Sequence, residues 1–184
     1  MLGSRVNARK DILLRQAVAA DFDVTFAIKK ASGGGYIRDV FGWDEQVQIA
    51  FHKRQFSPDN SDLILIDDDV IGWISVFDND DCTKIDELYV LPDVQNRGIG
   101  TSVLLEAVAH ARRRGLPVRV RVFKINERAI RLYERLGFRA QGEDGPFVHM
   151  VLGPCPGNDK QREMADNALD RTRASRVPDP PHPT

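Results

Sequence analysis

The segment from residue 88 to residue 101 constrains the fold most, because an apolar, strand-like run passes through a glycine-bearing turn into an amphipathic helix. The first N–H groups of a helix have no intrahelical partner, and the helix dipole adds partial positive charge there. Gly98 and Gly100 let the backbone approach a bulky anion, Arg97 can supply a cation, and Thr101 can supply a hydroxyl. The segment therefore predicts a binding site for an anion, most simply a pyrophosphate.

Two commoner phosphate-binding loops do not fit this segment. The P-loop requires G-x-x-x-x-G-K-[ST], a string that the chain lacks. The dinucleotide-binding fingerprint requires a small residue three positions after Gly100, where this chain has Val103. Its opening strand should also start a βαβ unit, which the preceding segment does not do.

The residues Gln95-Asn96-Arg97-Gly98-Ile99-Gly100 resemble the Q/R-x-x-G-x-G/A signature of the GNAT superfamily of acetyl-CoA-dependent N-acetyltransferases. Residues 126–138 resemble the superfamily's second signature, N-x-x-A-x-x-x-Y-x-x-x-G-F, and Ile71-Gly72-Trp73 is similar to a step in its central hairpin. The resemblance covers residues 11–152. It is specific because two motifs occur in the right order and at the right spacing.

This resemblance implies an α/β (α+β) fold in which helices flank a central, mixed but mostly antiparallel, splayed sheet. It also implies acetyl-CoA as cosubstrate and no metal. The residues expected to bind the cofactor are Leu88, Tyr89, Val90, Gln95, Asn96, Arg97, Gly98, Ile99, Gly100, Thr101, Asn126, Ala129 and Tyr133. Among them, Asn126 is expected both to cap a helix and to contact the pantetheine arm.

Acetyl transfer requires a deprotonated amine, a polarised carbonyl and a group that quenches the departing thiolate. By the resemblance, Tyr133 donates a proton or a strong hydrogen bond to the thiolate, and backbone N–H groups near Val90 polarise the carbonyl. Glu87 is expected to collect the proton of the amine, directly or through water, and strand alternation places it on one face with Tyr89. His149 is an alternative base, because an imidazole titrates near neutral pH.

The acceptor site is expected in the first third of the chain. Tyr36, Trp43, Asp44 and Glu45 follow a glycine run and can wall the amine site, with carboxylates attracting a cation. Tyr133, Ala129 and Trp43 also have purely structural interpretations, as residues that pack the core. The acceptor itself stays open: relatives of this fold acetylate small amines, peptides and proteins, and fold does not fix function.

Composition agrees with one compact enzyme domain. The chain has 184 residues, 42% of them hydrophobic, and a formal net charge of −1, which disfavours nucleic acid as a partner. The first ten residues do not form a secretory signal, and no apolar run is long enough to span a bilayer. We therefore expect a cytoplasmic protein. Cys82 and Cys155 match neither a disulfide framework nor a metal site.

Hydrophobic periodicity predicts most of the order β, α, α, β, β, β, α, β, α, β, β, which is also the order that the GNAT resemblance implies. The expected segments are a strand at 12–17, helices at 21–30 and 44–55 separated by a break at 32–35, a hairpin of 63–66 and 70–77, a strand at 85–90, a helix ending near Gly115, a strand at 118–122, a helix at 126–137 and strands up to 152. Asp21 and Asn126 are the expected helix caps. Residues 1–10 are expected to be a flexible N-terminus, 11–152 the domain, and 153–184 a Pro-rich tail.

Together these patterns predict direct transfer of an acetyl group from acetyl-CoA to a primary amine in a ternary complex, with no covalent intermediate. The acceptor is a small amine or an amine of a peptide or protein, and a homodimer is possible by analogy with the family. A non-catalytic acyl-CoA-binding module is the main alternative, and an interaction domain that keeps only the fold is a weaker one.

Overall fold

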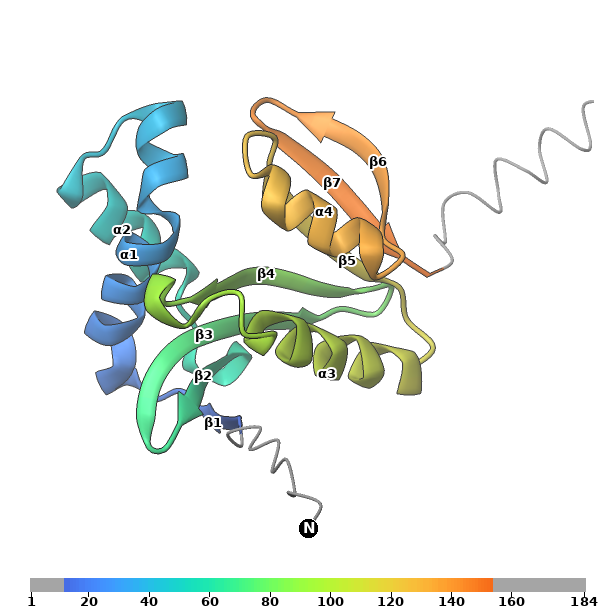
Figure 1. The fold of residues 1–184 in the computed structure, drawn as a ribbon, viewed down its shortest axis with the longest axis horizontal. Coiled ribbons are helices and arrows are strands. Elements are labelled where there is room, and N and C mark those ends of the chain that lie inside the picture. Colours follow the sequence, from blue (N-terminus) through green and yellow to red (C-terminus); the bar gives the residue numbers. More distant parts are fainter. Residues whose placement is uncertain (1–11, 154–184) are drawn as a thin grey trace, which may run out of the picture. The chain divides into compact units, whose positions relative to one another are not determined.

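The computed structural model describes residues 12–153 (Figure 1). Its helices and strands are β1 (Leu13–Gln16), α1 (Phe22–Phe41), α2 (Glu45–Gln55), β2 (Ser61–Ile66), β3 (Asp69–Asp78), β4 (Thr83–Val90), α3 (Ile99–Arg113), β5 (Val118–Phe123), α4 (Glu127–Arg135), β6 (Arg139–Asp144) and β7 (Phe147–Leu152). This order is the one predicted from the sequence. The predictions for the two ends, including Cys155, lie outside the described residues.

The seven strands form one sheet in the order β1-β2-β3-β4-β5-β7-β6. All neighbouring pairs are antiparallel except β4 and β5, which pair in parallel only from Thr83–Val118 to Ile85–Val120. The expectation that the strand before the glycine turn does not open a βαβ unit is wrong, because β4, α3 and β5 form one. Beyond Ile85 the two strands diverge, as the separation of β4 from the β5–β7 half in Figure 1 shows. The predicted mixed, mostly antiparallel and splayed sheet is therefore confirmed.

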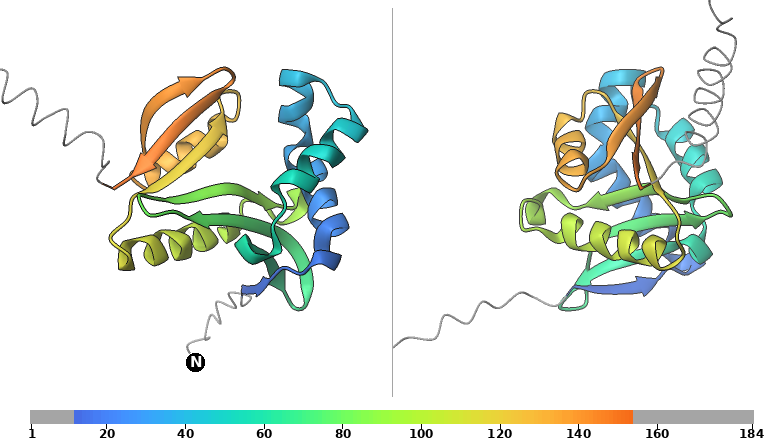
Figure 2. Two further views of the ribbon diagram at one scale, coloured as in Figure 1. Left: turned by 180° about the vertical axis from the view of Figure 1, so that it is seen from behind. Right: turned by 90° about the vertical axis from the view of Figure 1, so that its right-hand side faces the viewer.

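Helices cover both faces of the sheet. The helices α1 and α2 lie on one face, and α3 and α4 lie on the other (Figure 2). The larger core joins the apolar side of α3, including Val103, Leu104 and Val108, to the sheet, and the smaller core joins Ile28 of α1 to Trp73 of β3. The helix after the glycine turn was expected to be amphipathic, and α3 buries one apolar side, made of Ile99, Val103, Leu104, Val108 and Ala111.

The predicted break in the first helix is wrong, because α1 continues through the glycines to Phe41. A Cβ at Gly33 would lie 2.6 Å from Cε1 of Tyr89, and a Cβ at Gly34 would lie 3.2 Å from Cζ3 of Trp43. Glycine lowers helix propensity by about 1 kcal/mol relative to alanine. Here that cost is offset by the close packing of the helix against two aromatic rings.

A β-bulge in β4 determines which side chains face α1. Ser75 pairs with Glu87 but Val76 pairs with Ile85, so Asp86 is the extra residue. Ile85 and Leu88 join the core on the α3 side, whereas Glu87 and Tyr89 face α1. The prediction that Glu87 and Tyr89 share a face is confirmed, and the structure identifies that face.

The helix ends were predicted with mixed success. Asn126 caps α4 by accepting a hydrogen bond from the N–H of Ala129 at 3.1 Å, and Gly115 after α3 has φ 70°. Asp21 stands at the N-cap of α1, but its side chain makes no capping bond to that helix. Its carboxylate instead accepts from the N–H of Val18 at 2.8 Å and pairs with Arg15.

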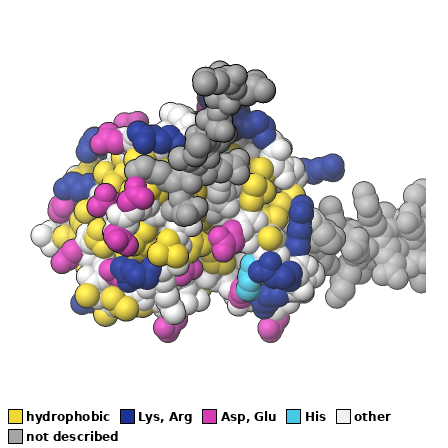
Figure 3. Space-filling view, turned by 60° about the horizontal axis from the view of Figure 1, so that its bottom comes forward, with side chains coloured by type: hydrophobic (Ala, Val, Ile, Leu, Met, Phe, Trp, Pro, Cys, Tyr) yellow, Lys and Arg dark blue, Asp and Glu magenta, His cyan; other side chains and the backbone are white. Residues whose placement is uncertain are grey.

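The described surface carries mixed charge. Figure 3 shows acidic, basic and hydrophobic side chains interspersed on one face. Within residues 12–153 no helix is both long and apolar enough to cross a membrane. Cys82 is buried and unpaired.

Candidate active site

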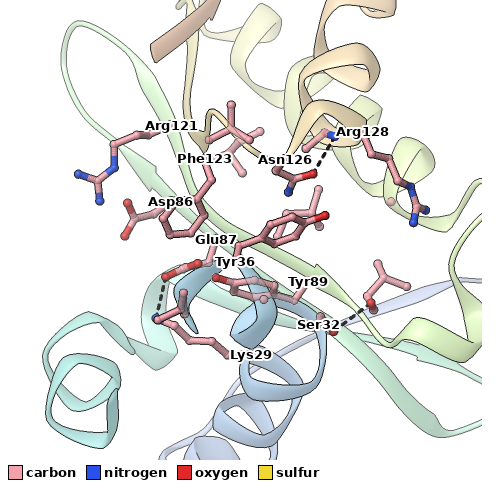
Figure 4. A pocket seen from close by; sticks show the side chains of 18 of the residues that line it. Lys29, Ser32, Tyr36, Asp86, Glu87, Tyr89, Arg121, Phe123, Asn126 and Arg128 are labelled. Atoms are coloured by element: carbon pink, nitrogen blue, oxygen red, sulfur yellow. Dashed lines mark hydrogen bonds and ion pairs between the residues drawn. The ribbon is translucent and has the colours of Figure 1, made fainter. Parts of the chain in front are cut away.

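A cavity of about 1010 Å³ opens over β4 at the place where the sheet splays. Such a volume is at the upper end of the range for small-molecule sites. The lining comes from both halves of the molecule: α1 and α2 on one side, and α3, β5, α4 and the start of β7 on the other. Figure 4 shows labelled side chains of α1, β4, β5 and the start of α4 around the same space.

One end of the cavity is formed by the turn at residues 95–101, which the sequence predicts to bind an anion; we call this turn the cradle. Asn96 and Gly98 adopt left-handed conformations, with φ of 63° and 82°, and thereby turn the chain into α3. Gln95, Asn96, Gly98, Ile99, Gly100 and Thr101 all line the cavity. Arg97 is absent from this lining, and its guanidinium donates to the carbonyl of Asp93 at 3.0 Å. The glycine turn thus has the expected geometry, but the expected cation does not face the cavity.

Arg128 of α4 supplies a cation that the sequence analysis missed. It lines the cavity near the cradle and donates to Oε1 of Gln95 at 2.7 Å. Nε2 of Gln95 in turn donates to the carbonyl of Val90 at 2.7 Å. The amide of Gln95 therefore connects the N-terminal end of α4 to the end of β4. Arg128 occupies a variable position of the second motif, so the motif gave no signal for it.

The free edge of β4 borders the cavity. Hydrogen bonding alternates along an antiparallel ladder, and Leu91 donates to the carbonyl of Ile71 at 2.8 Å. By this alternation the backbone polar groups of Leu88 and Val90 point away from β3, toward the gap with β5. Consistent with this direction, the carbonyl of Val90 also accepts a bond from the Ser32 hydroxyl at 3.0 Å.

Tyr133 lies in the wall of the cavity opposite α1. It is nearly fully buried, and its ring packs edge-on against Phe138, with 5.3 Å between centroids. Burial, together with the negative charge of Glu87, raises the pKa of Tyr133 to about 12. The phenol therefore stays protonated and available as a hydrogen-bond donor. Ala129 and Asn126 line the same wall.

Glu87 lies on the opposite side of the cavity in a hydrogen-bonded network. Nζ of Lys29, on α1, contacts Oε1 of Glu87 at 3.1 Å and also donates to Gln55 at 2.9 Å (Figure 4). Burial raises the pKa of Tyr89 well above its usual value, and the charge of Glu87 and a hydrogen bond with it raise that pKa further. Nothing in the sequence pattern indicated Lys29 as the partner.

The expected acceptor residues are brought together only in part. Tyr36, Trp43 and Asp44 line the cavity, but Glu45 does not. Glu45 accepts from Lys30 at 2.8 Å and from Nε1 of Trp43 at 2.7 Å, so its charge is balanced locally. Asp44 caps α2 by accepting from the N–H of Val47 at 3.0 Å.

His149, the alternative base, is also placed elsewhere. It pairs with Arg121 within the β5–β7 ladder and is not part of the cavity lining. Of the two candidate bases, Glu87 lines the cavity and His149 does not.

A match to a family model shows to which protein family the chain belongs. The model of the acetyltransferase (GNAT) family matches residues 31–138, which is more than half of the chain. The chain belongs to this family. A curated relative, an uncharacterised N-acetyltransferase of Methanocaldococcus jannaschii, is 40% identical over 81 residues, which are 44% of this chain and 36% of that protein. The match thus spans about a third of the relative's length.

Solved structures share the GNAT fold at low sequence identity. The PaiA N-acetyltransferase of Thermoplasma acidophilum in complex with coenzyme A has a TM-score of 0.66 at 18% identity, over 78% of this chain and 99% of that one. The ribosomal-protein-S18-alanine N-acetyltransferase of Escherichia coli has a TM-score of 0.57 at 18% identity, over 77% and 91% of the two chains. At this identity the likeness establishes the fold, which agrees with the GNAT resemblance of the sequence.

Proposed function

We propose that this GNAT protein transfers an acetyl group from acetyl-CoA to a primary amine by direct attack within a ternary complex. The observation that carries the proposal is the shared cavity. The cradle at the start of α3, the free edge of β4, Tyr133 and Glu87 all face one continuous space. A thioester held along β4 and an amine entering from the α1 side can therefore meet without a covalent enzyme intermediate.

The cradle and the gap between β4 and β5 suit different parts of acetyl-CoA. The turn at Asn96 and Gly98 aims the start of α3 at the cavity, which favours an anionic group such as the pyrophosphate. Arg128 and Thr101 border the same end. The backbone groups of Leu88 and the N–H of Val90 lack strand partners on the β5 side, so they can pair with the pantetheine arm as an additional strand would.

The reaction needs one bond formed and one broken. The amine nitrogen attacks the thioester carbonyl carbon, the C–N bond forms, and the C–S bond breaks with the electron pair leaving on sulfur. The N–H of Val90 is the proposed donor to the developing oxyanion, a contact that in acyl transfer contributes roughly 3 kcal/mol. Glu87 takes the proton of the amine, directly or through water, and solvent returns a proton to the thiolate.

Tyr133 stabilises the leaving thiolate by donating a hydrogen bond. With its pKa near 12, well above about 8.5 for an alkyl thiol, full proton transfer to sulfur is unfavourable. A charge-assisted hydrogen bond from the neutral phenol needs no such transfer. Of the two expected roles of Tyr133, proton donor and hydrogen-bond donor, the proposal therefore takes the second.

The proposal is tested by release of free CoA thiol from acetyl-CoA across a panel of amines, peptides and polyamines. We expect acceptor-dependent turnover in the wild-type protein and a decrease in kcat of about 10²-fold in Glu87→Gln. A matched control is Glu106→Gln, which changes a carboxylate on α3 that lies outside the cavity lining.

Binding measured in parallel separates the proposal from the alternative function. Acetyl-CoA binding without turnover on any acceptor would indicate an acyl-CoA-binding module. Absence of acetyl-CoA binding would contradict both functions, because both depend on the cradle.

A further inference from the structure

One part of the cavity lining is built from aromatic rings. Tyr36 and Phe41 come from α1, Phe123 ends β5, and Phe147 begins β7; we call these four residues the aromatic wall. The centroids of Phe123 and Phe147 are 4.6 Å apart, and Phe123 lies 6.1 Å from Phe41 and 6.4 Å from Tyr36. These separations are typical of favourable ring pairs. Segments distant in sequence therefore present one aromatic surface to the cavity.

This surface extends onto α2 and is unusually exposed. Phe41 has 61% of its surface exposed, Val47 47% and Phe51 45%, yet all three line the cavity. Val47 and Phe51 are one helical turn apart, so they present a continuous apolar strip. Apolar side chains that stay solvent-exposed inside a concave site are typical of ligand-binding surfaces.

Two of the three carboxylates in the cavity lining are each paired with a lysine. Glu87 pairs with Lys29 at 3.1 Å and Asp86 pairs with Lys84 at 2.5 Å. Asp44, the third carboxylate in this part of the lining, caps α2. A polycationic acceptor is held best by several unpaired carboxylates, and the described lining does not offer such a set. The lining offers apolar area beside Glu87, and one of its rings, Phe147, is also covered by the guanidinium of Arg121 at 4.3 Å from the ring centroid.

We infer that the acceptor is a primary amine that carries an aromatic ring. Its ring would lie against the aromatic wall and the α2 strip, while its amine reaches the carbonyl held beside Glu87 and Val90. Figure 4 shows Tyr36, Phe123 and Glu87 around the same part of the cavity. This inference deepens the proposed function and rests on it for the reaction, although not for the binding of the ring.

The inference is tested by comparing 2-phenylethylamine, propylamine and spermidine as acceptors. We expect kcat/KM for 2-phenylethylamine to exceed the values for the other two at least tenfold, because burying a ring removes a large apolar area from water. Phe51→Ala is expected to raise KM for 2-phenylethylamine several-fold while leaving KM for acetyl-CoA unchanged. Leu105→Ala is the matched control, since Leu105 is 49% exposed on α3 and outside the cavity lining.

A direct titration of 2-phenylethylamine into the CoA-bound protein separates the two proposals. Binding that Phe51→Ala weakens supports the inference even if no amine is acetylated, a result that would contradict the proposed function instead. Turnover that favours spermidine, or that treats propylamine and 2-phenylethylamine alike, would overturn the inference and leave acetyl transfer standing. Failure of the ring-bearing amine to bind would overturn it as well.

Discussion

Tyr133 shows how the environment of one residue sets its chemistry. Its hydroxyl is buried in the cavity wall, and burial with the nearby charge of Glu87 holds its pKa at about 12. Replacement by phenylalanine keeps the ring that packs on Phe138 but removes the donor. We expect Tyr133→Phe to lower kcat about 10²-fold.

The same variant should leave the dissociation constant of acetyl-CoA within about twofold of the wild-type value in calorimetric titrations. An unchanged kcat would contradict a role for the hydroxyl at the thiolate. Because Tyr133 stays protonated well above pH 10, the wild-type rate should also show no decrease from its ionisation up to about pH 11.

His52 controls stability rather than catalysis. Its ring is buried among Phe22, Phe56 and Trp73, and Nε2 lies 3.0 Å from the hydroxyl of Thr25. Burial, with a smaller contribution from Lys29, lowers the pKa of His52 from about 6.5 to about 4. Between these values the unfolded chain binds a proton that the native protein does not.

The free energy of unfolding should therefore decrease as the pH falls from about 6.5 to about 4, by up to about 3 kcal/mol from this group. Above pH 6.5 its contribution is constant. Urea denaturation at several pH values, in the wild-type protein and in His52→Phe, measures the effect as a difference in slope. Identical slopes in the two proteins would contradict it.

At the scale of elements, α1 depends on its glycines unequally. A Cβ at Gly33 would meet the ring of Tyr89 at 2.6 Å, whereas a Cβ at Gly35 meets nothing within 4 Å. Gly33→Ala should lower the free energy of unfolding by about 1–3 kcal/mol through overpacking. Gly35→Ala should raise it by about 0.5–1 kcal/mol, because alanine favours the helix.

Thermal and urea denaturation of the two variants check this contrast, each serving as the control for the other. Equal effects of the two substitutions on the free energy of unfolding would contradict the expected clash between a side chain at position 33 and the ring of Tyr89. Gly33→Ala should also reduce acetyl transfer, since Tyr89 lines the cavity beside Glu87.

These glycines also show what sequence patterns can and cannot predict. Periodicity predicted most strands and helices of the described region in order, because each pattern is local, whereas the exposed strand β6 carries no such pattern. The continuation of α1 through Gly33 and Gly34 was missed, because the rings that fill their missing side chains come from Tyr89 and Trp43, outside the helix.

In the candidate site, too, the features set by local sequence were predicted and those set by contacts between elements were not. The turn at Gly98 and the cap at Asn126 are local and were predicted with their geometry. Lys29 and Arg128 were not, because each acts through a partner on another element, Glu87 and Gln95 respectively. The bulge that turns Ile85 and Glu87 to opposite faces likewise depends on pairing with β3.

At the scale of the whole molecule, function depends on the divergence of β4 and β5. Their pairing ends at Ile85 and Val120, and the cavity that follows is lined from both halves of the sheet. The account requires that acetyl-CoA and the amine occupy this one cavity together. An acetyl-cysteine intermediate at Cys82 is not part of this mechanism, because Cys82 is buried and lies outside the cavity lining.

The most direct test of this central claim is the initial-velocity pattern of acetyl transfer, with acetyl-CoA and the amine acceptor varied against each other. The account predicts reciprocal plots that intersect, because both substrates must be bound before the acetyl group moves. Parallel lines, which indicate release of CoA before the amine binds, would contradict direct transfer within the shared cavity.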